Sequence, residues 1–417
     1  MLLKYYHKFN CEKLISNNSL FWQLKKGRKM KKILIILIIM QTIILINPFC
    51  LFGYTEATTN NTDEIINIQK DTLNISDFIN ESEKYTRESM PEIDINNLLS
   101  SAITGNIDNV KLIRLFCSLL GKEVLSSITV IRSIIVIIVI HSILKSISDG
   151  LGNKSVAQIT YYVQYILIVT LVMTSFADII NMVKESIQNL VGFMNSLIPI
   201  LITLMITTGN IVSAGMLQPI ILFIITIIGN FIVNVIIPIV LVSTALGIIS
   251  QISDKVQIDK LAKFFKSSSI WILGIILTLF VGITSLEGSL SSSVDGITAK
   301  TTKVAVSNFI PVVGKILGDA VDTVMGCSII LKNALGIVGV IIIIGICAIP
   351  ILKLVTLMSM YYIGAALCQP IADSKIIKLL SQMGDTFKLL LAILTSVSVM
   401  LIIGVTVVIK ISNAGIT

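Results

Sequence analysis

The stretch ALGIVGVIIIIGICAIPIL, residues 334–352, contains no charged side chain. A helix of about 20 apolar residues crosses a hydrocarbon core about 30 Å thick. Within a bilayer, a helix satisfies the hydrogen bonds of its own backbone, which an isolated extended chain cannot do. Apolar blocks of this length recur along the chain. The sequence therefore predicts an all-α fold, a polytopic helical membrane protein.

The multi-pass transmembrane domain is expected to occupy residues 124–417, with about seven to nine spans. Residues 353–385 leave two alternatives open, a full span or a broken, re-entrant helix. Spans are predicted at roughly residues 126–147, 159–180, 193–208, 212–230, 231–250, 268–286, 334–352, 354–369 and 386–409.

The composition excludes several classes of protein. Hydrophobic residues make up 54% of the chain and charged residues 13%, against about 25% charged in soluble domains. The net charge is +8, but the basic residues are dispersed and no soluble basic domain is present, so nucleic acid is not an expected partner. With two histidines and six cysteines that form no close pair, we expect no metal site and no cofactor.

The N-terminal extension, residues 1–57, carries the pattern of a signal peptide. A basic segment precedes an apolar run at residues 33–46, and Pro48 and small residues follow. An uncleaved membrane anchor is the alternative. Met30 opens this pattern by itself, so translation from Met30 is an alternative to translation from Met1.

Residues 58–123 differ in composition, being acidic and rich in Asn and Ser. We expect this segment to be extracytoplasmic and partly disordered, with short amphipathic helices from Leu98 onward that lie on the membrane surface. The loop at 251–267 contains a cluster of lysines and is expected in the cytoplasm by the positive-inside rule. Two further interfacial amphipathic helices, at 181–194 and 254–269, would contact membrane lipids.

The polar stretch at 307–336 predicts another interfacial helix. Pro311 suits a first helical turn, and the apolar residues that follow recur at intervals of three and four. Gly314 and Gly318 form a GxxxG step that lets a second backbone approach closely. Asp319 and Asp322 lie on the polar side of the predicted helix. Two roles are open, docking of a partner or capping of the bundle of its own subunit.

Four common enzyme motifs do not occur in the sequence, namely the Walker A, dinucleotide-binding, HExxH and GxSxG patterns. Gly-Asp pairs at Asp319 and Asp385 invite comparison with intramembrane aspartyl proteases, but neither stretch reads GxGD. Arg132 and His141 lie near the middle of the first predicted span, on opposite sides of an ideal helix. We therefore expect no catalytic residue and no enzymatic activity.

Three stretches resemble one protein family. They read ADIINMVKESIQNLVGFMNSLIPILITLM, DGITAKTTKVAVSNFIPVVGKILGDAVDTVMGCSIILKNALGIVGVI and YYIGAALCQPIAD. Together they are similar to the stage III sporulation protein AE family of endospore-forming bacteria, over roughly residues 90–409.

The resemblance implies a subunit of the channel-like, secretion-like complex between mother cell and forespore, in the membrane derived from the mother cell. It implies other membrane and ring subunits of that complex as partners, a role in late forespore development and no enzymatic activity. A homo-oligomer is left open. The alternatives are an independent multi-pass permease and an intramembrane hydrolase.

Overall fold

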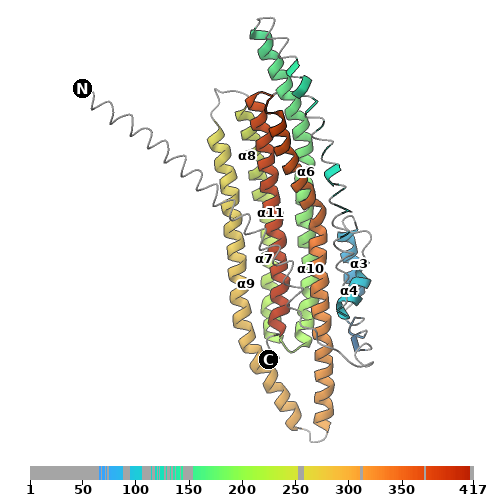
Figure 1. Ribbon diagram of the computed structural model, residues 1–417. Helices are drawn as coiled ribbons and strands as arrows, with labels where there is room; N and C mark the ends of the chain where they lie inside the picture. The colour runs from blue at the N-terminus through green and yellow to red at the C-terminus, as the bar shows by residue number, and fades with distance from the viewer. Residues whose placement is uncertain are drawn as a thin grey trace, which may run out of the picture. The chain divides into compact units, whose positions relative to one another are not determined.

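The computed structural model describes residues 65–87 with gaps at 67, 71 and 73–74, residues 94–105, scattered positions between 114 and 143, and residues 154–413 with gaps at 252–257, 310–312 and 371. Over residues 287–319 it describes the backbone alone. Every regular element in the described part of the chain is helical, and five helical runs there are long and apolar enough to cross a membrane (Figure 1). The predicted all-α membrane fold is confirmed.

The two C-terminal helices, α10 (Val313–Cys368) and α11 (Ser374–Asn413), form the most extensive helix pair. They lie side by side in the orange and red part of the ribbon (Figure 1). Both helices bury many Leu, Ile and Val side chains, and the rings of Tyr361 and Phe387, 5.2 Å apart, also meet across the pair. Gly336 on α10 permits the close approach, because a Cβ there would lie 2.1 Å from Cδ1 of Ile409.

Helices α6 (Lys154–Thr207) and α7 (Ile211–Phe231) form a hairpin beside this pair. Gly209 makes the reversal possible with a φ of 82°, in the left-handed region that only glycine adopts at little cost. A π-helical turn, η1 (Ile232–Ile236), then connects α7 to α8 (Ile237–Ser250) without a loop. The run from α7 to α8 is therefore one continuous helix with a local irregularity.

Helix α9 (Asp259–Phe309) packs against α7, α8 and α11. Its inner face places the fully buried ring of Phe280 against Gly404. Its outer face exposes large apolar side chains, among them Trp271, which is 72% exposed, and Leu279. An apolar outer face of this kind suits contact with lipid chains.

Two short helices, α3 (Ile75–Thr86) and α4 (Ile95–Ile103), pack on the long ones, α3 mainly on α6 and α4 on α10. The side chain of Asp94 caps α4 by accepting the N–H of Asn96 over 2.8 Å. The rings of Phe78 and Phe193 lie 6.0 Å apart. Helix α3 thus occurs where we expected disorder, because its apolar side chains find a partner that the local sequence does not reveal.

The long helices differ from the predicted spans. Each of three pairs of predicted spans lies within one uninterrupted helical run, so the helix ends predicted between their members are wrong. Polar residues between two apolar blocks do not break a helix when no turn residue interrupts the backbone hydrogen bonds. The pairs are 159–180 with 193–208, 212–230 with 231–250, and 334–352 with 354–369.

The predicted interfacial helices are also parts of longer ones. Residues 181–194 lie in the middle of α6, residues 259–269 begin α9, and α10 begins at Val313 within the polar stretch. The predicted span at 126–147 and the signal peptide fall largely or wholly outside the described residues.

The helical runs are longer than a bilayer is thick. The apolar part of α10, Ala320–Cys368, has 49 residues, which corresponds to about 74 Å of helix. Even a tilt of about 40° accommodates only about 39 Å of helix in a hydrocarbon core of about 30 Å. The bundle therefore extends beyond the hydrocarbon core on at least one side.

Candidate functional site

One carboxylate connects three of the long helices. Lys266 Nζ on α9 lies 2.9 Å from Oδ2 of Asp385 on α11, and the Tyr362 hydroxyl on α10 donates a hydrogen bond of 2.6 Å to Oδ1 of the same carboxylate. The side chains of Lys266 and Asp385 are 31% and 49% exposed. The three residues hold the ends of α9, α10 and α11 in register.

The local sequence makes room for this arrangement. Gly384, which precedes Asp385, faces the ring of Tyr362, and a Cβ on Gly384 would lie 3.2 Å from two ring carbons. The glycine therefore lets the tyrosine lie flat against α11 and reach the carboxylate. Because the ion pair is half-exposed, its contribution to stability is about 0–1 kcal/mol, so its main effect is on which helices meet.

The adjacent turns of α8 and α11 continue this polar contact. The hydroxyls of Thr244 and Thr386 lie 3.2 Å apart, and Gln382 Nε2 donates to the carbonyl of Thr244 over 3.4 Å. Gly247 faces the Gln382 amide so closely that any Cβ would overlap it.

Two further hydroxyls bind the backbone of a neighbouring helix. Ser243 Oγ donates to the Ala262 carbonyl over 2.8 Å, and the Tyr165 hydroxyl donates to the Ile248 carbonyl over 2.8 Å. These contacts join α8 to α9 and α6 to α8. The polar side chains that join α6, α8, α9, α10 and α11 in these contacts are together called the polar cluster. It comprises Tyr165, Ser243, Thr244, Lys266, Tyr362, Gln382, Asp385 and Thr386.

The polar cluster is built for holding helices together. Its carboxylate is paired with a cation and a phenol, and its hydroxyls donate to carbonyl groups, so no base stands ready beside a free nucleophile. Among the residues that the structure describes, no group of three His, Cys, Asp or Glu side chains could hold a metal ion.

A second polar contact joins the N-terminal segment to α10. The Gln69 amide donates to Ser328 Oγ over 2.8 Å and to the Val324 carbonyl over 3.2 Å. One turn further along α10, Lys332 is fully buried. Burying a lysine is costly unless polar groups surround it, and Gln69 brings a polar side chain to this part of α10.

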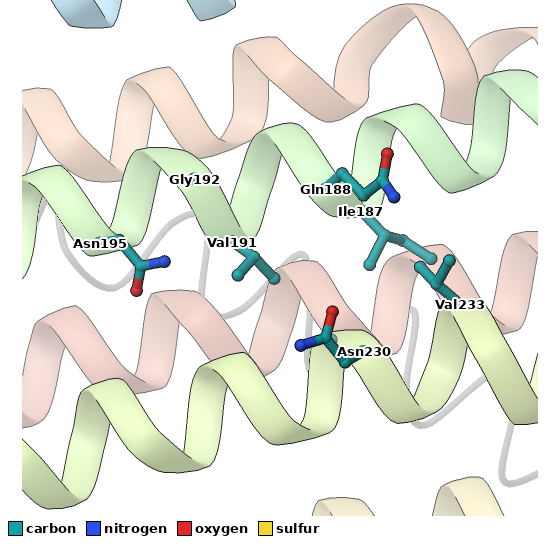
Figure 2. A pocket seen from close by; sticks show the side chains of 8 residues that line it. Ile187, Gln188, Val191, Gly192, Asn195, Asn230 and Val233 are labelled. Atoms are coloured by element: carbon teal, nitrogen blue, oxygen red, sulfur yellow. The ribbon is translucent and has the colours of Figure 1, made fainter.

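An open groove of about 250 Å³ lies between α6 and α7, at the start of η1 (Figure 2). The carboxamides of Gln188, Asn195 and Asn230 line it, and all three side chains are exposed. Gly192 forms part of its wall, with the Tyr85 hydroxyl 2.7 Å from the position of a Cβ on Gly192. Burial, with Glu81 nearby, raises the pKa of Tyr85, so its hydroxyl stays protonated.

The residues predicted from the polar stretch at 307–336 do not join these contacts. Pro311 lies outside the described residues. Gly314, Gly318 and Asp319 lie in the first turns of α10, where the structure describes the backbone alone, and Asp322 is exposed on α10. Asp385 contacts Tyr362, which lies 40 residues beyond Asp322 on the same helix, a distance of about 60 Å. Asp385 therefore cannot form an aspartyl dyad with Asp319 or Asp322, which both lie near the start of α10.

Other polar residues singled out from the sequence stand apart too. Arg132 is exposed, and His141 lies outside the described residues. Sequence reasoning missed Gln69 and Lys332, and it treated Lys266 only as part of a basic loop. A lysine surrounded by apolar residues, as Lys332 is, was a usable signal. Gln69 gave none, because it lies in a segment where polar residues are common.

A profile of the stage III sporulation protein AE family matches residues 93–412. The chain belongs to the stage III sporulation protein AE family. It is also 33% identical over 296 residues to stage III sporulation protein AE of Bacillus subtilis (strain 168). The aligned residues cover 71% of this chain and 74% of that protein. No solved structure matches the chain. The family match begins just before α4 and includes every long helix of the bundle.

Proposed function

We propose that this protein is a non-enzymatic integral membrane subunit of the channel-like, secretion-like complex between mother cell and forespore, needed for late forespore development. The observation that carries the proposal is the family match over residues 93–412, because it spans the whole helical bundle and not one isolated motif. A sporulation role follows from the family, and the bundle supplies the means of residing in a membrane.

The polar contacts support a subunit over an enzyme. Lys266, Asp385 and Tyr362 are all engaged in contacts between helices. The groove between α6 and α7 is open to the side, whereas sites that bind small molecules enclose most of the ligand. A subunit of a membrane complex needs stable contacts between its helices and accessible outer faces, and this bundle has both.

The proposed location is the mother-cell-derived membrane around the forespore, with other membrane and ring subunits of the complex and membrane lipids as partners. The length of the bundle supports such partners, because about 74 Å of α10 cannot lie within one hydrocarbon core. The part that extends from the bilayer offers surface to other subunits.

Complementation of a null strain tests the proposal. The chain is expected to restore late forespore gene expression, measured with a forespore reporter, and to copurify with the other membrane and ring subunits from sporulating cells. An Asp319→Asn/Asp322→Asn variant is expected to retain reporter expression if it accumulates normally, because neither carboxylate performs chemistry.

Proteoliposomes that contain only the purified chain provide the contrary test. Specific solute uptake by these vesicles, together with normal late forespore expression in the null strain, would contradict the proposal and establish an independent permease.

A further inference from the structure

Exposed carboxamides interrupt an otherwise apolar outer face of α7 and η1. One exposed side of this helix carries residues at intervals of three and four, apolar over its first four turns and polar at its end. No charged residue occurs between 211 and 250. The stripe consists of Ile211, Gly215, Pro219, Phe223, Ile227, Asn230 and Asn234.

At least one of these asparagines lies at membrane depth. The apolar run Ile211–Ser250 has 40 residues, while a span takes about 20. Every window of about 20 residues within the run contains Asn230, Asn234 or both, inside the span or at its edge.

Two prolines leave backbone carbonyl groups without their helical hydrogen-bond donors, at two of the asparagines that bear these carboxamides. Pro199 follows Asn195 by four residues on α6, and Pro238 follows Asn234 by four residues at the start of α8. Because proline has no N–H, the carbonyls of Asn195 and Asn234 lack their α-helical donors. The π-helical turn reflects the second interruption, since the Ile237 N–H donates to the carbonyl of Ile232, five residues earlier.

The side-chain carboxamides have no hydrogen-bond partner in the described part of the chain. In the described part of the chain, no hydrogen bond uses the side chains of Gln188, Asn195, Asn230 or Asn234. A nearby hydroxyl group does have a hydrogen-bond partner, because Thr203 Oγ1 donates to the Pro199 carbonyl over 2.9 Å. Polar groups left unpaired in hydrocarbon are unfavourable, so whichever of Asn230 and Asn234 lies in the hydrocarbon core requires a partner from outside the subunit.

We propose that this partner is a second copy of the same chain, docked groove to groove along the amide seam, which comprises Gln188, Asn195, Asn230 and Asn234. A carboxamide both donates and accepts hydrogen bonds, so the seam is complementary to itself across a twofold axis. The uncharged run from 211 to 250 brings no charge repulsion on its side of the contact.

The shape of the seam fits the same arrangement. The groove is an open hollow beside Asn230 (Figure 2), and Phe231, 38% exposed, offers a side chain for the hollow of the opposite copy. The outer face of α9 provides the contrast, because the residues exposed there from Ile270 to Leu286 include no carboxamide. That face suits lipid, and the seam suits another helix. The proposal does not depend on the proposed function.

Cysteine cross-linking in membranes tests the proposal with the full chain. Single substitutions Asn195→Cys, Asn230→Cys and Asn234→Cys are compared with Trp271→Cys on the outer face of α9, with the parent chain as baseline. A short bis-maleimide is expected to give a covalent dimer for at least one seam position and none above baseline at Trp271. Equal dimer at Trp271, or cross-linking of seam positions only to a different protein, would overturn the proposal.

A second measurement removes the amides without removing apolar surface. Asn230→Leu/Asn234→Leu is expected to raise the dissociation constant of the dimer about tenfold and so to lower the dimer fraction, the effect of losing two hydrogen bonds between membrane helices. Thr278→Leu, which removes an exposed polar side chain from α9, is the matched control and is expected to leave the dimer fraction unchanged. An unchanged dimer fraction in the double variant at equal accumulation would refute the amide seam.

Discussion

Replacing Gly247 by alanine tests how tightly α8 and α11 meet in the polar cluster. A Cβ at this position would lie 1.6 Å from Gln382 Nε2 and 2.5 Å from Cδ, so the Gln382 side chain must leave its place and give up its hydrogen bond to the Thr244 carbonyl. Overpacking of this kind costs about 1–3 kcal/mol. Alanine regains about 1 kcal/mol through helix propensity, so we expect a net loss of up to about 2 kcal/mol.

The informative variant is Gly247→Ala/Gln382→Ala. With the glutamine side chain removed, the new methyl group enters space that is already free, and only the gain in helix propensity remains. We therefore expect the double variant to be more stable than the sum of the single changes by about 1–3 kcal/mol. Gly274→Ala on α9 is the control, because nothing lies within 4 Å of a Cβ there, and it is expected to be neutral or slightly stabilising.

Thermal unfolding of the purified chain in detergent measures these differences. The Gly247→Ala protein is expected to unfold at a temperature a few degrees lower, and the double variant to recover most of the shift. Additive effects, within about 0.5 kcal/mol, would refute the reasoning, since they would show that Gln382 does not occupy the space beside Gly247.

Three further predictions concern other parts of the chain. Gln69→Ala is expected to make the N-terminal segment several-fold more sensitive to protease in membrane vesicles, because its hydrogen bonds to α10 are lost, whereas Asp77→Ala, at an exposed position, should not. Gly318→Leu is expected to block copurification of complex subunits while membrane insertion persists, with Asp319→Asn much milder; the reverse result would contradict a packing role for the GxxxG step. A cysteine at Lys263 should be protected from an impermeant reagent in intact cells and one at Asp77 labelled, and the opposite pattern would invert the topology.

The candidate site was only partly predictable. The sequence marked Asp385 as a residue near a glycine, and it placed Lys266 in a basic loop. It could not show that the two form an ion pair, because the pair joins α9 to α11 and depends on how those helices pack. The GxxxG step at Gly314 and Gly318 stays a prediction, since the structure describes only the backbone there.

The sequence by itself determined the class of the fold and the family. Apolar blocks of membrane-spanning length specify helices, because burial in hydrocarbon and backbone hydrogen bonding act on each segment locally. The stretches at 177–205, 295–341 and 361–373 were enough to indicate the family, which the match over residues 93–412 then showed.

Only the tertiary structure decided where the helices end and which of them meet. Residues predicted as separate spans continue through single helices such as α10, because no turn residue interrupts the backbone hydrogen bonds between the apolar blocks. The docking of α3 on α6 and the pairing of Lys266 with Asp385 join residues distant in the chain. Such contacts depend on the surfaces that packing brings together, and local periodicity carries no record of them.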